Sequence, residues 1–464
     1  MTVRNALWMA GLGSVFAWPM LAMAQDVTAG LPTMATPPAL MEAAPTTGIP
    51  SLMPGVASEG VETAGESPVT ESAGKGRFLP RLGGLPSGGV RGLFTPGVAD
   101  GAANSRFWFT GEGLLMWTKN MNIPPLVTTG PVVVGGTAGV LGQPGTLPLI
   151  DKSINFGSSV GGRFTLGGWV LPDVPLGLEV SYLFLAETSG HRGLAENGMA
   201  GSRFLSVPFF DAVTNVESAS PIAFPTGRGY SGTVDVRITT RLQGFEVTAG
   251  TDFGSFCGVH FVGLAGYRNL SLQENLTFST TSTNTNPLAL DVFRTTDNFH
   301  TANDFHGGQI GLRSDYCVGP VTLTSTGKVA LGHMRQQTRI DGSLVTNDFN
   351  GLGVPQTFNS GYLATDTNSG TFGRDRIAIV PEFQFAAGWQ PISWLRLSLG
   401  YQVLYINEVA RPGDQIDRVI NTSQVPAILG APSLGLVGPA RPIAPVAHSD
   451  FWVQGLTAGL EFKF

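Results

Sequence analysis

Residues 394–405 read WLRLSLGYQVLY, and this stretch decides the fold class because its side chains alternate in character. One face collects apolar side chains, namely Leu395, Leu397, Leu399, Tyr401, Val403 and Tyr405. The other face is mostly polar or small and collects Arg396, Ser398, Gly400, Gln402 and Leu404. A β-strand points successive side chains to opposite faces, so this period of two predicts a strand with one apolar face and one polar face.

The same alternation recurs at 321–331, 377–389 and 452–464. Extended along the chain, it predicts ten strands of about 11 to 20 residues. Ordinary globular strands have ~5–6 residues, whereas ~9–11 are enough to cross a bilayer. The expected strands lie near 107–118, 157–169, 177–187, 234–251, 259–278, 302–314, 320–334, 376–390, 394–407 and 451–464.

The links between these strands alternate in length. Four are short, at 170–176, 252–258, 315–319 and 391–393, and five are long, at 119–156, 188–233, 279–301, 335–375 and 408–450. Short links on one side and long links on the other are typical of outer-membrane barrels. The predicted fold is therefore all-β: a transmembrane antiparallel up-and-down β-barrel of about ten strands, or twelve, with long extracellular loops and short periplasmic turns. A secreted sandwich or propeller is the alternative, because its apolar faces would form a core.

The composition agrees with a membrane protein. Charged residues make up 13% of the 464 residues, against about 25% in soluble domains, and the net charge is −6. A general nucleic-acid binder would instead carry a basic patch, so we expect no nucleic-acid partner. Two cysteines cannot supply a four-cysteine zinc site, and we expect no cofactor.

The first part of the chain predicts export. Arg4, an apolar run and Ala22-Met23-Ala24 predict a signal peptide over 1–24, although an anchoring helix is the alternative. Residues 25–105 are rich in Pro, Gly, Ala, Ser and Thr and predict a disordered periplasmic linker. Residues 106–464 form the predicted barrel, located in the outer membrane of a diderm bacterium. We expect its partners to be the lipid bilayer and the outer-membrane assembly machinery, with the oligomeric state open.

Several longer motifs follow one another in a fixed order: GEGLLMW at 111–117, GRFTLG at 162–167, FHGGQIGL at 305–312, RPGDQIDRV at 411–419 and DFWVQGL at 450–456. With them, residues 107–464 resemble the putative beta-barrel porin-7 family, outer-membrane barrels of unknown function known chiefly from planctomycete bacteria. The resemblance implies an outer-membrane barrel and, by its label alone, a porin. It implies no substrate and no catalytic residue.

Charged residues on the polar faces are the candidate lining of a lumen. We expect Arg163, Glu179, Arg241, Arg313, Lys328, Glu382, Arg396, Glu461 and Lys463 to face inward, and Arg237, Glu246 and Arg268 lie where the alternation is imperfect. Opposite charges inside a barrel would bridge strands and set the field that a solute meets. Ten strands leave a narrow or plugged bore, since eight-stranded barrels are filled by side chains.

Two functions fit this pattern. The leading one is a porin that gives passive passage to small solutes or ions through a narrow charge-lined lumen. The alternative is a non-conducting surface barrel whose long loops serve adhesion or envelope organisation. An enzyme is not expected, because no His-Glu-x-x-His or Gly-x-Ser-x-Gly pattern occurs and no catalytic or metal site is predicted.

Further residues have candidate roles. Arg411, Asp414, Asp417 and Arg418 open the last long loop. The two carboxylates could ligate calcium, but ion pairs with the two arginines that fold the loop over the barrel mouth are favoured.

Two features concern the ends of strands. The chain ends on Leu460, Phe462 and Phe464 at alternate positions, which predicts a last strand recognised by the assembly machinery. Cys257 and Cys317 lie in short links, and two intervening strands would separate them by roughly 10 Å, farther than the ~7 Å that a disulfide spans. A disulfide and two free thiols both remain open.

Overall fold

The computed structural model describes residues 106–464 except 132–136, 171–175, 226–228, 287–290, 348–353, 431 and 434. The predicted signal peptide and linker, 1–24 and 25–105, lie outside the described residues. Within the described ranges, no helix is long and apolar enough to cross a membrane.

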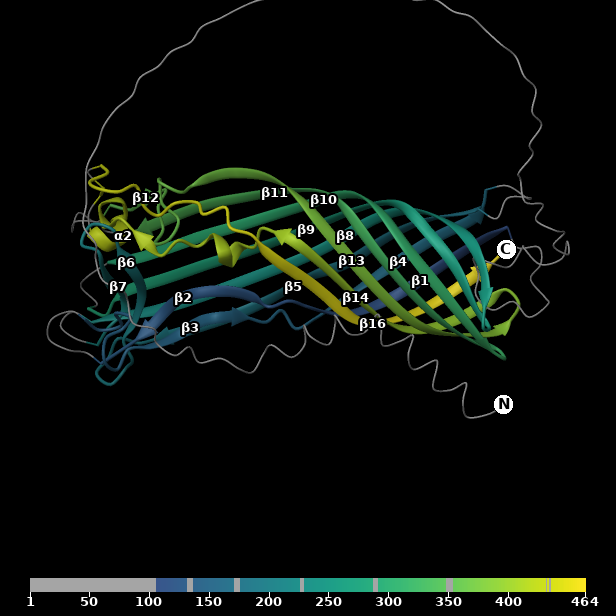
Figure 1. Ribbon diagram of the computed structural model, residues 1–464. Helices are drawn as coiled ribbons and strands as arrows, with labels where there is room; N and C mark the ends of the chain where they lie inside the picture. Colours follow the sequence, from purple (N-terminus) through teal and green to yellow (C-terminus); the bar gives the residue numbers. More distant parts are fainter. Residues whose placement is uncertain are drawn as a thin grey trace, which may run out of the picture. The chain divides into compact units, whose positions relative to one another are not determined.

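Ten antiparallel strands form a closed barrel in which each strand pairs with its neighbours along the chain (Figure 1). The first strand pairs with the last, with Leu115 opposite Leu456, and this pairing closes the ring. The predicted all-β up-and-down barrel of about ten strands is therefore confirmed. The ten barrel strands are β1 (Phe107–Thr118), β4 (Ser158–Trp169), β5 (Leu176–Glu196), β8 (Tyr230–Phe256), β9 (Val259–Asn284), β10 (Val292–Val318), β11 (Val321–Thr346), β13 (Gly370–Ile392), β14 (Leu395–Val409) and β16 (Ser449–Lys463).

Apolar side chains cover the outside of the barrel near its short turns. Ile310, Ile377 and Leu399 are 71%, 76% and 63% exposed, and each alternates with a less exposed neighbour along its strand. Exposing apolar area to water costs about 25 cal/mol per Å², so this surface fits lipid rather than water. We call this surface the apolar belt, and it ends at the row of paired residues from Phe245 through Asn269, His306 and His333 to Ile377.

Six strands continue beyond the apolar belt. β5, β8, β9, β10, β11 and β13 have 21 to 27 residues, whereas β1, β4, β14 and β16 have 12 to 15. Beyond the belt the two faces exchange character. On β9, Leu276 and Phe278 are buried inside, while Gln273, Asn275 and Thr277 face outward.

This exchange corrects the predicted extents of the loops. The long links expected at 188–233, 279–301 and 335–375 consist largely of strand, because β5, β8, β9, β10, β11 and β13 run into them. Water replaces lipid outside these segments, so their outward side chains are polar. The apolar alternation that marks a lipid-facing strand is therefore missing there.

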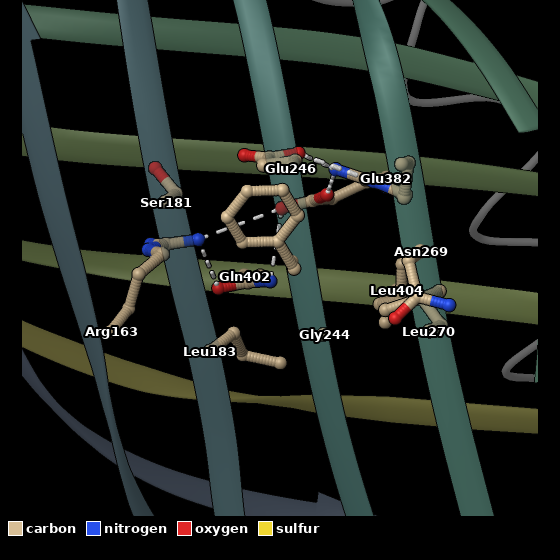
Figure 2. A pocket seen from close by; sticks show the side chains of 12 residues that line it. Arg163, Ser181, Leu183, Gly244, Glu246, Asn269, Leu270, Glu382, Gln402 and Leu404 are labelled. Carbon is tan, nitrogen blue, oxygen red and sulfur yellow. Dashed lines mark hydrogen bonds and ion pairs between the residues drawn. The ribbon is translucent and has the colours of Figure 1, made fainter. Parts of the chain in front are cut away.

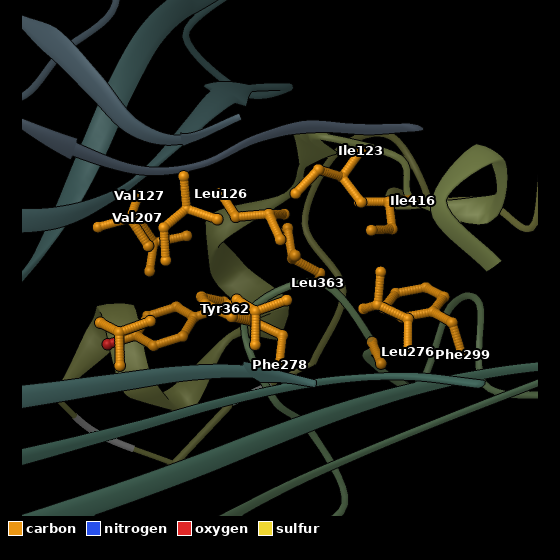
Figure 3. Packing of buried hydrophobic residues seen from close by; sticks show 14 of the residues in the cluster. Ile123, Leu126, Val127, Val207, Leu276, Phe278, Phe299, Tyr362, Leu363 and Ile416 are labelled. Carbon is orange, nitrogen blue, oxygen red and sulfur yellow. The ribbon is translucent and has the colours of Figure 1, made fainter. Parts of the chain in front are cut away.

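The extended strands form one layer of a two-layer head at the end of the barrel opposite the short turns. The other layer is a small sheet of β15 (Val419–Ile420), β6 (Leu205–Asp211), β2 (Met121–Thr129) and β3 (Leu147–Ile154), with β7 (Val216–Ala223) paired to β6. Between the layers lies a buried apolar core that joins Leu126 and Val207 to Leu276, Phe278 and Phe299 (Figure 3). We call this two-layer unit the outer head. Its remaining short elements are β12 (Gln356–Phe358), η1 (Pro412–Gln415), η2 (Thr422–Gln424) and α2 (Pro426–Leu429).

Candidate functional site: the barrel lumen and its cover

A cluster of opposite charges crosses the lumen inside the belt. Lys328 Nζ lies 2.8 Å from Glu246 Oε1, and Arg268 pairs with both Glu246 and Glu382. Arg163 reaches the same Glu382 carboxylate from the opposite wall, at 3.6 Å (Figure 2). These side chains come from β4, β8, β9, β11 and β13, so the cluster ties together strands that are not neighbours.

Amide side chains add hydrogen bonds to this cluster. Gln402 donates to Glu382 at 3.0 Å and accepts from Arg163 at 3.1 Å. Gln309 donates to Glu246 at 3.2 Å and to Thr248 Oγ1 at 2.7 Å. A buried charge is tolerated when it is paired and hydrogen-bonded, and these amides fill several of the positions around the two carboxylates. Among the described residues, Arg268 Nη1 and Gln309 Oε1 are buried without a hydrogen-bond partner.

A second set of ion pairs lies closer to the short turns. Arg313 pairs with Glu179 at 3.1 Å, and Glu461 lies between Arg396 at 3.9 Å and Lys463 at 3.5 Å. A cavity of about 150 Å³ lies between the two sets. We call it the vestibule. Its lining includes the four acids Glu112, Glu179, Glu246 and Glu461 and the four bases Arg163, Arg313, Lys328 and Arg396.

Eight of the nine residues proposed from sequence to line the lumen lie on the inward side. All eight take part in the ion pairs just described, and Lys463, which pairs with Glu461, is buried. Arg241 differs: it is exposed, and it alternates with the buried Leu242. Its strand carries inward side chains at even-numbered positions, so Arg241 faces outward.

Sequence reasoning missed one acid of the vestibule. Glu112 pairs with Arg163 at 2.5 Å. It lies in the GEGLLMW motif at 111–117, where the glycines on either side interrupt the alternation of apolar and polar residues. Its position directly opposite Arg163 in the strand register is the signal that identifies the pair.

An apolar layer lies between the charge cluster and the outer head. Sixteen buried residues form one packed cluster, with contributions from nine of the ten barrel strands. Among them, Leu114, Leu242, Phe305, Met334 and Phe451 come from five different strands and are at most 4% exposed. A layer of packed apolar side chains offers few hydrogen-bonding partners to water or ions.

A buried ion pair fastens the last long loop to the barrel. Arg411 donates from Nε and Nη2 to the carboxylate of Glu274, at 2.9 and 2.7 Å, and lies 5.5 Å from the centre of the Phe451 ring. Arg411 also donates to the backbone oxygens of Asn120 and Lys119. Burial alone would lower the pKa of Arg411, but Glu274 beside it holds the pKa above its ordinary value.

The other three residues proposed for the mouth loop have partners different from those expected. Asp417 pairs with Arg441 at 2.9 Å, and Arg418 pairs with Glu217 at 2.9 Å. Asp414 accepts a hydrogen bond from Ser449 at 2.8 Å. Arg411 and Arg418 thus hold the loop to Glu274 and Glu217 of other segments, whereas Asp417 and Arg441 pair within the loop. Across the described ranges, no three His, Cys, Asp or Glu side chains are arranged to hold a metal ion.

A buried carboxylate fastens a second inserted loop. Asp297 of β10 is fully buried and accepts hydrogen bonds from the backbone N–H groups of Tyr362, Leu363 and Ala364, at 3.2, 2.8 and 2.7 Å. Burial raises the pKa of Asp297 to about 6, although the three N–H donors oppose the rise. A side chain at Gly361 would overlap this carboxylate, so only glycine fits there.

The features predicted at the strand ends are the terminal apolar residues and the two cysteines. Leu460 and Phe464 are exposed on the outer face of the last strand, in line with Phe462. Cys257 and Cys317 are exposed free thiols. Cys257 lies in the turn between β8 and β9, and Cys317 lies at the end of β10 beside the next turn.

A closed ring of ten strands with a lipid-facing belt defines an outer-membrane β-barrel. The family model described as putative beta barrel porin-7 matches residues 108–464. The chain belongs to this family, whose name describes a porin and not an enzyme.

Solved structures add only fold likeness. The outer membrane protease OmpT from Escherichia coli is 8% identical, with 78% of this chain and 97% of that one covered and a TM-score of 0.37. A FadL homologue from Pseudomonas aeruginosa is 9% identical, with 78% and 92% covered and a TM-score of 0.20. The P. putida toluene transporter TodX is 7% identical, with 78% and 90% covered and a TM-score of 0.19. No curated protein matches the chain.

Proposed function

We propose that this protein is an outer-membrane barrel that is closed to solutes in this state and that anchors and displays the outer head at the cell surface. The observation that carries the proposal is the apolar layer, because nine of the ten barrel strands contribute to it. Two inserted loops, fastened by Arg411 and Asp297, add further packing above that layer. The signal peptide proposed for 1–24 would deliver the chain to the envelope.

The displayed head suits a structural or adhesive role. Its two layers share a core of buried aliphatic and aromatic side chains, so its outer surface is held in one shape. The family's porin name supports a role without catalysis. We assign no catalytic residue.

Passive passage of small solutes or ions is the second candidate. It is supported by the vestibule, whose lining of four acids and four bases suits water and small polar solutes. For passage to occur, the apolar layer and the fastened loops would have to move aside. The charge cluster would then become the selectivity element.

A liposome-swelling assay separates the two candidates. Vesicles containing the full-length protein are diluted into isosmotic solutions of small sugars and amino acids, and swelling reports uptake. We expect swelling no faster than in empty vesicles. A matched variant that opens the layer, Leu242→Gly with Phe305→Gly, should speed swelling, which shows that the assay detects an open barrel. Fast swelling of the wild type would support the porin instead.

A further inference from the structure

The outer wall just beyond the apolar belt carries polar side chains that the barrel and its lumen do not use. Two rows of paired residues cross β8 to β11 there: Gln243, Ser271, Asp304 and Arg335 in the first, and Arg241, Gln273, Ala302 and Gln337 in the second. No large apolar side chain occurs in either row. Protein-binding surfaces are usually centred on aromatic and large apolar anchors, so these rows do not resemble one.

Two tyrosines mark the level of these rows in the membrane. The hydroxyl of Tyr182 donates to Gln243 Oε1 at 3.3 Å, and that of Tyr267 lies 2.6 Å from His306 Nδ1. Both rings lie on the lipid-facing side, and both are more than 40% exposed. Tyrosine concentrates where hydrocarbon meets the polar headgroups. The two rows therefore stand at the height of the outer-leaflet headgroups.

The chemistry of the rows favours a hydroxyl-rich headgroup. Gln243, Gln273, Gln337 and Ser271 offer amide and hydroxyl groups, each able to donate and accept. Within the described residues, Arg241 and Arg335 make no ion pair or hydrogen bond, so their guanidinium donors point to solvent or lipid. Asp304 is paired opposite Arg335 in the strand register, so the two rows together carry one net positive charge.

We propose that this face, made of Arg241, Gln243, Ser271, Gln273, Arg335 and Gln337, binds the sugar headgroup of a glycolipid in the outer leaflet. Its continuity with the apolar belt supports the choice of ligand: one molecule can place its acyl chains on the belt and its sugar on these rows. Three amides and one hydroxyl outnumber the two arginines on this face, and they suit sugar hydroxyls better than phosphate alone. In this proposal the headgroup is the ligand of Arg241, whose side chain faces outward and not into the lumen.

Native mass spectrometry of the full-length protein in detergent tests this proposal. The probes are a short-chain lipopolysaccharide, phosphatidylethanolamine and soluble dextran, each added in a titration. We expect the lipopolysaccharide to bind more tightly than phosphatidylethanolamine, and dextran, which lacks acyl chains, to leave no adduct. The triple variant Gln243→Ala, Gln273→Ala and Gln337→Ala should bind the lipopolysaccharide about tenfold more weakly or worse, because each lost hydrogen bond lowers the affinity several-fold.

A matched control lies on the same face farther from the belt. Ser279→Ala, Thr281→Ala and Thr283→Ala remove three polar side chains of β9 and should change the affinity by no more than about twofold. Heat-modifiable migration on a gel shows that each variant is folded, and the single Gln273→Ala replaces the triple variant if that one does not fold. Equal binding of both lipids, equal affinity of the test and control variants, dextran adducts, or adducts of a second copy of the chain would each overturn the proposal.

Discussion

Arg241 and Arg268 show that the face of a strand determines the surroundings of a charged side chain. Arg268 points inward, where Glu246 and Glu382 surround it, and it is 3% exposed. Arg241 points outward near the edge of the belt and is exposed. The two residues have the same chemistry, but only Arg268 is part of a buried network. We therefore expect substitutions at the two faces to differ sharply in their effect on stability.

Glu382→Gln should destabilise the barrel. It removes the carboxylate shared by Arg163, Arg268 and Lys328, so these three buried bases keep only Glu112 and Glu246 as acidic partners. Breaking a buried pair in this way costs about 3 kcal/mol or more. Urea unfolding in vesicles measures the loss. Arg241→Gln is the control and should change the free energy of unfolding by less than about 0.5 kcal/mol; equal effects would contradict the assignment of the two faces.

Asp297 should make the stability of the outer head depend on pH. The folded carboxyl has a pKa of about 6 against an ordinary value of 3.8. Because the pKa is raised in the folded state, protonation of Asp297 stabilises the folded head. This contribution is fully present when the pH is below 3.8, and it is lost as the pH rises through about 6. The expected loss is about 3 kcal/mol.

Limited proteolysis of the head between pH 4 and pH 8 measures this dependence. We expect cleavage of the wild-type head to speed up as the pH rises through about 6. Asp297→Asn cannot ionise, so its cleavage should change much less over that interval. A variant with the same pH dependence as the wild type would show that another group is responsible.

At the scale of single residues, the sequence predicts side-chain direction better than it predicts partners. Alternation within a strand placed eight of the nine proposed lining residues inward. It misplaced Arg241 because the apolar face of β8 changes sides near Leu242. The partners of Arg411 and Arg418 are Glu274 and Glu217, which lie far away along the chain. Such pairs depend on how the loops pack, and no local pattern records that.

Among the elements, the extended strands show how a change of solvent changes the pattern. Near the short turns a strand has lipid outside and a polar lumen inside. Beyond the belt it has water outside and the apolar core of the head inside. Alternation therefore predicts the positions of all ten strands but makes six of them too short. The small sheet of the head could not be predicted, since β15 pairs with β6 across some 200 residues.

Adjacent substitutions on β9 test the exchange of faces. Phe278 is fully buried in the core of the head, whereas Thr277 faces outward beside Asn298. Phe278→Ala should cost about 3 to 5 kcal/mol and expose the head to proteases. Thr277→Ala should leave the rate of cleavage almost unchanged. Equal sensitivity of the two variants would mean that the strand does not have the faces described.

The whole molecule is a stack of layers along the barrel. The vestibule opens near the short turns, the charge cluster follows, the apolar layer lies above it, and the outer head stands beyond the belt. Each layer depends on contacts between strands and loops that are distant in sequence. Composition and alternation predict a barrel, but they do not say whether its lumen is filled.

The two native cysteines test the orientation of this stack. Cys257 and Cys317 are exposed in the turns at the end opposite the outer head. If the short turns face the periplasm, a maleimide that cannot cross membranes should label neither thiol in intact cells and both after the outer membrane is permeabilised. Cys257→Ser with Cys317→Ser provides the control. Labelling in intact cells would show that the barrel is inserted the other way round.

Single-channel recording tests the central claim, that the lumen is sealed, most directly. Purified full-length protein is inserted into a planar bilayer at neutral pH in molar salt, and insertion is verified with the Leu242→Gly, Phe305→Gly variant, which should open steps of constant size. For the wild type we predict a flat current with no unitary steps, because the apolar layer excludes ions. Regular steps from the wild type, abolished by an antibody against the outer head, would contradict the account.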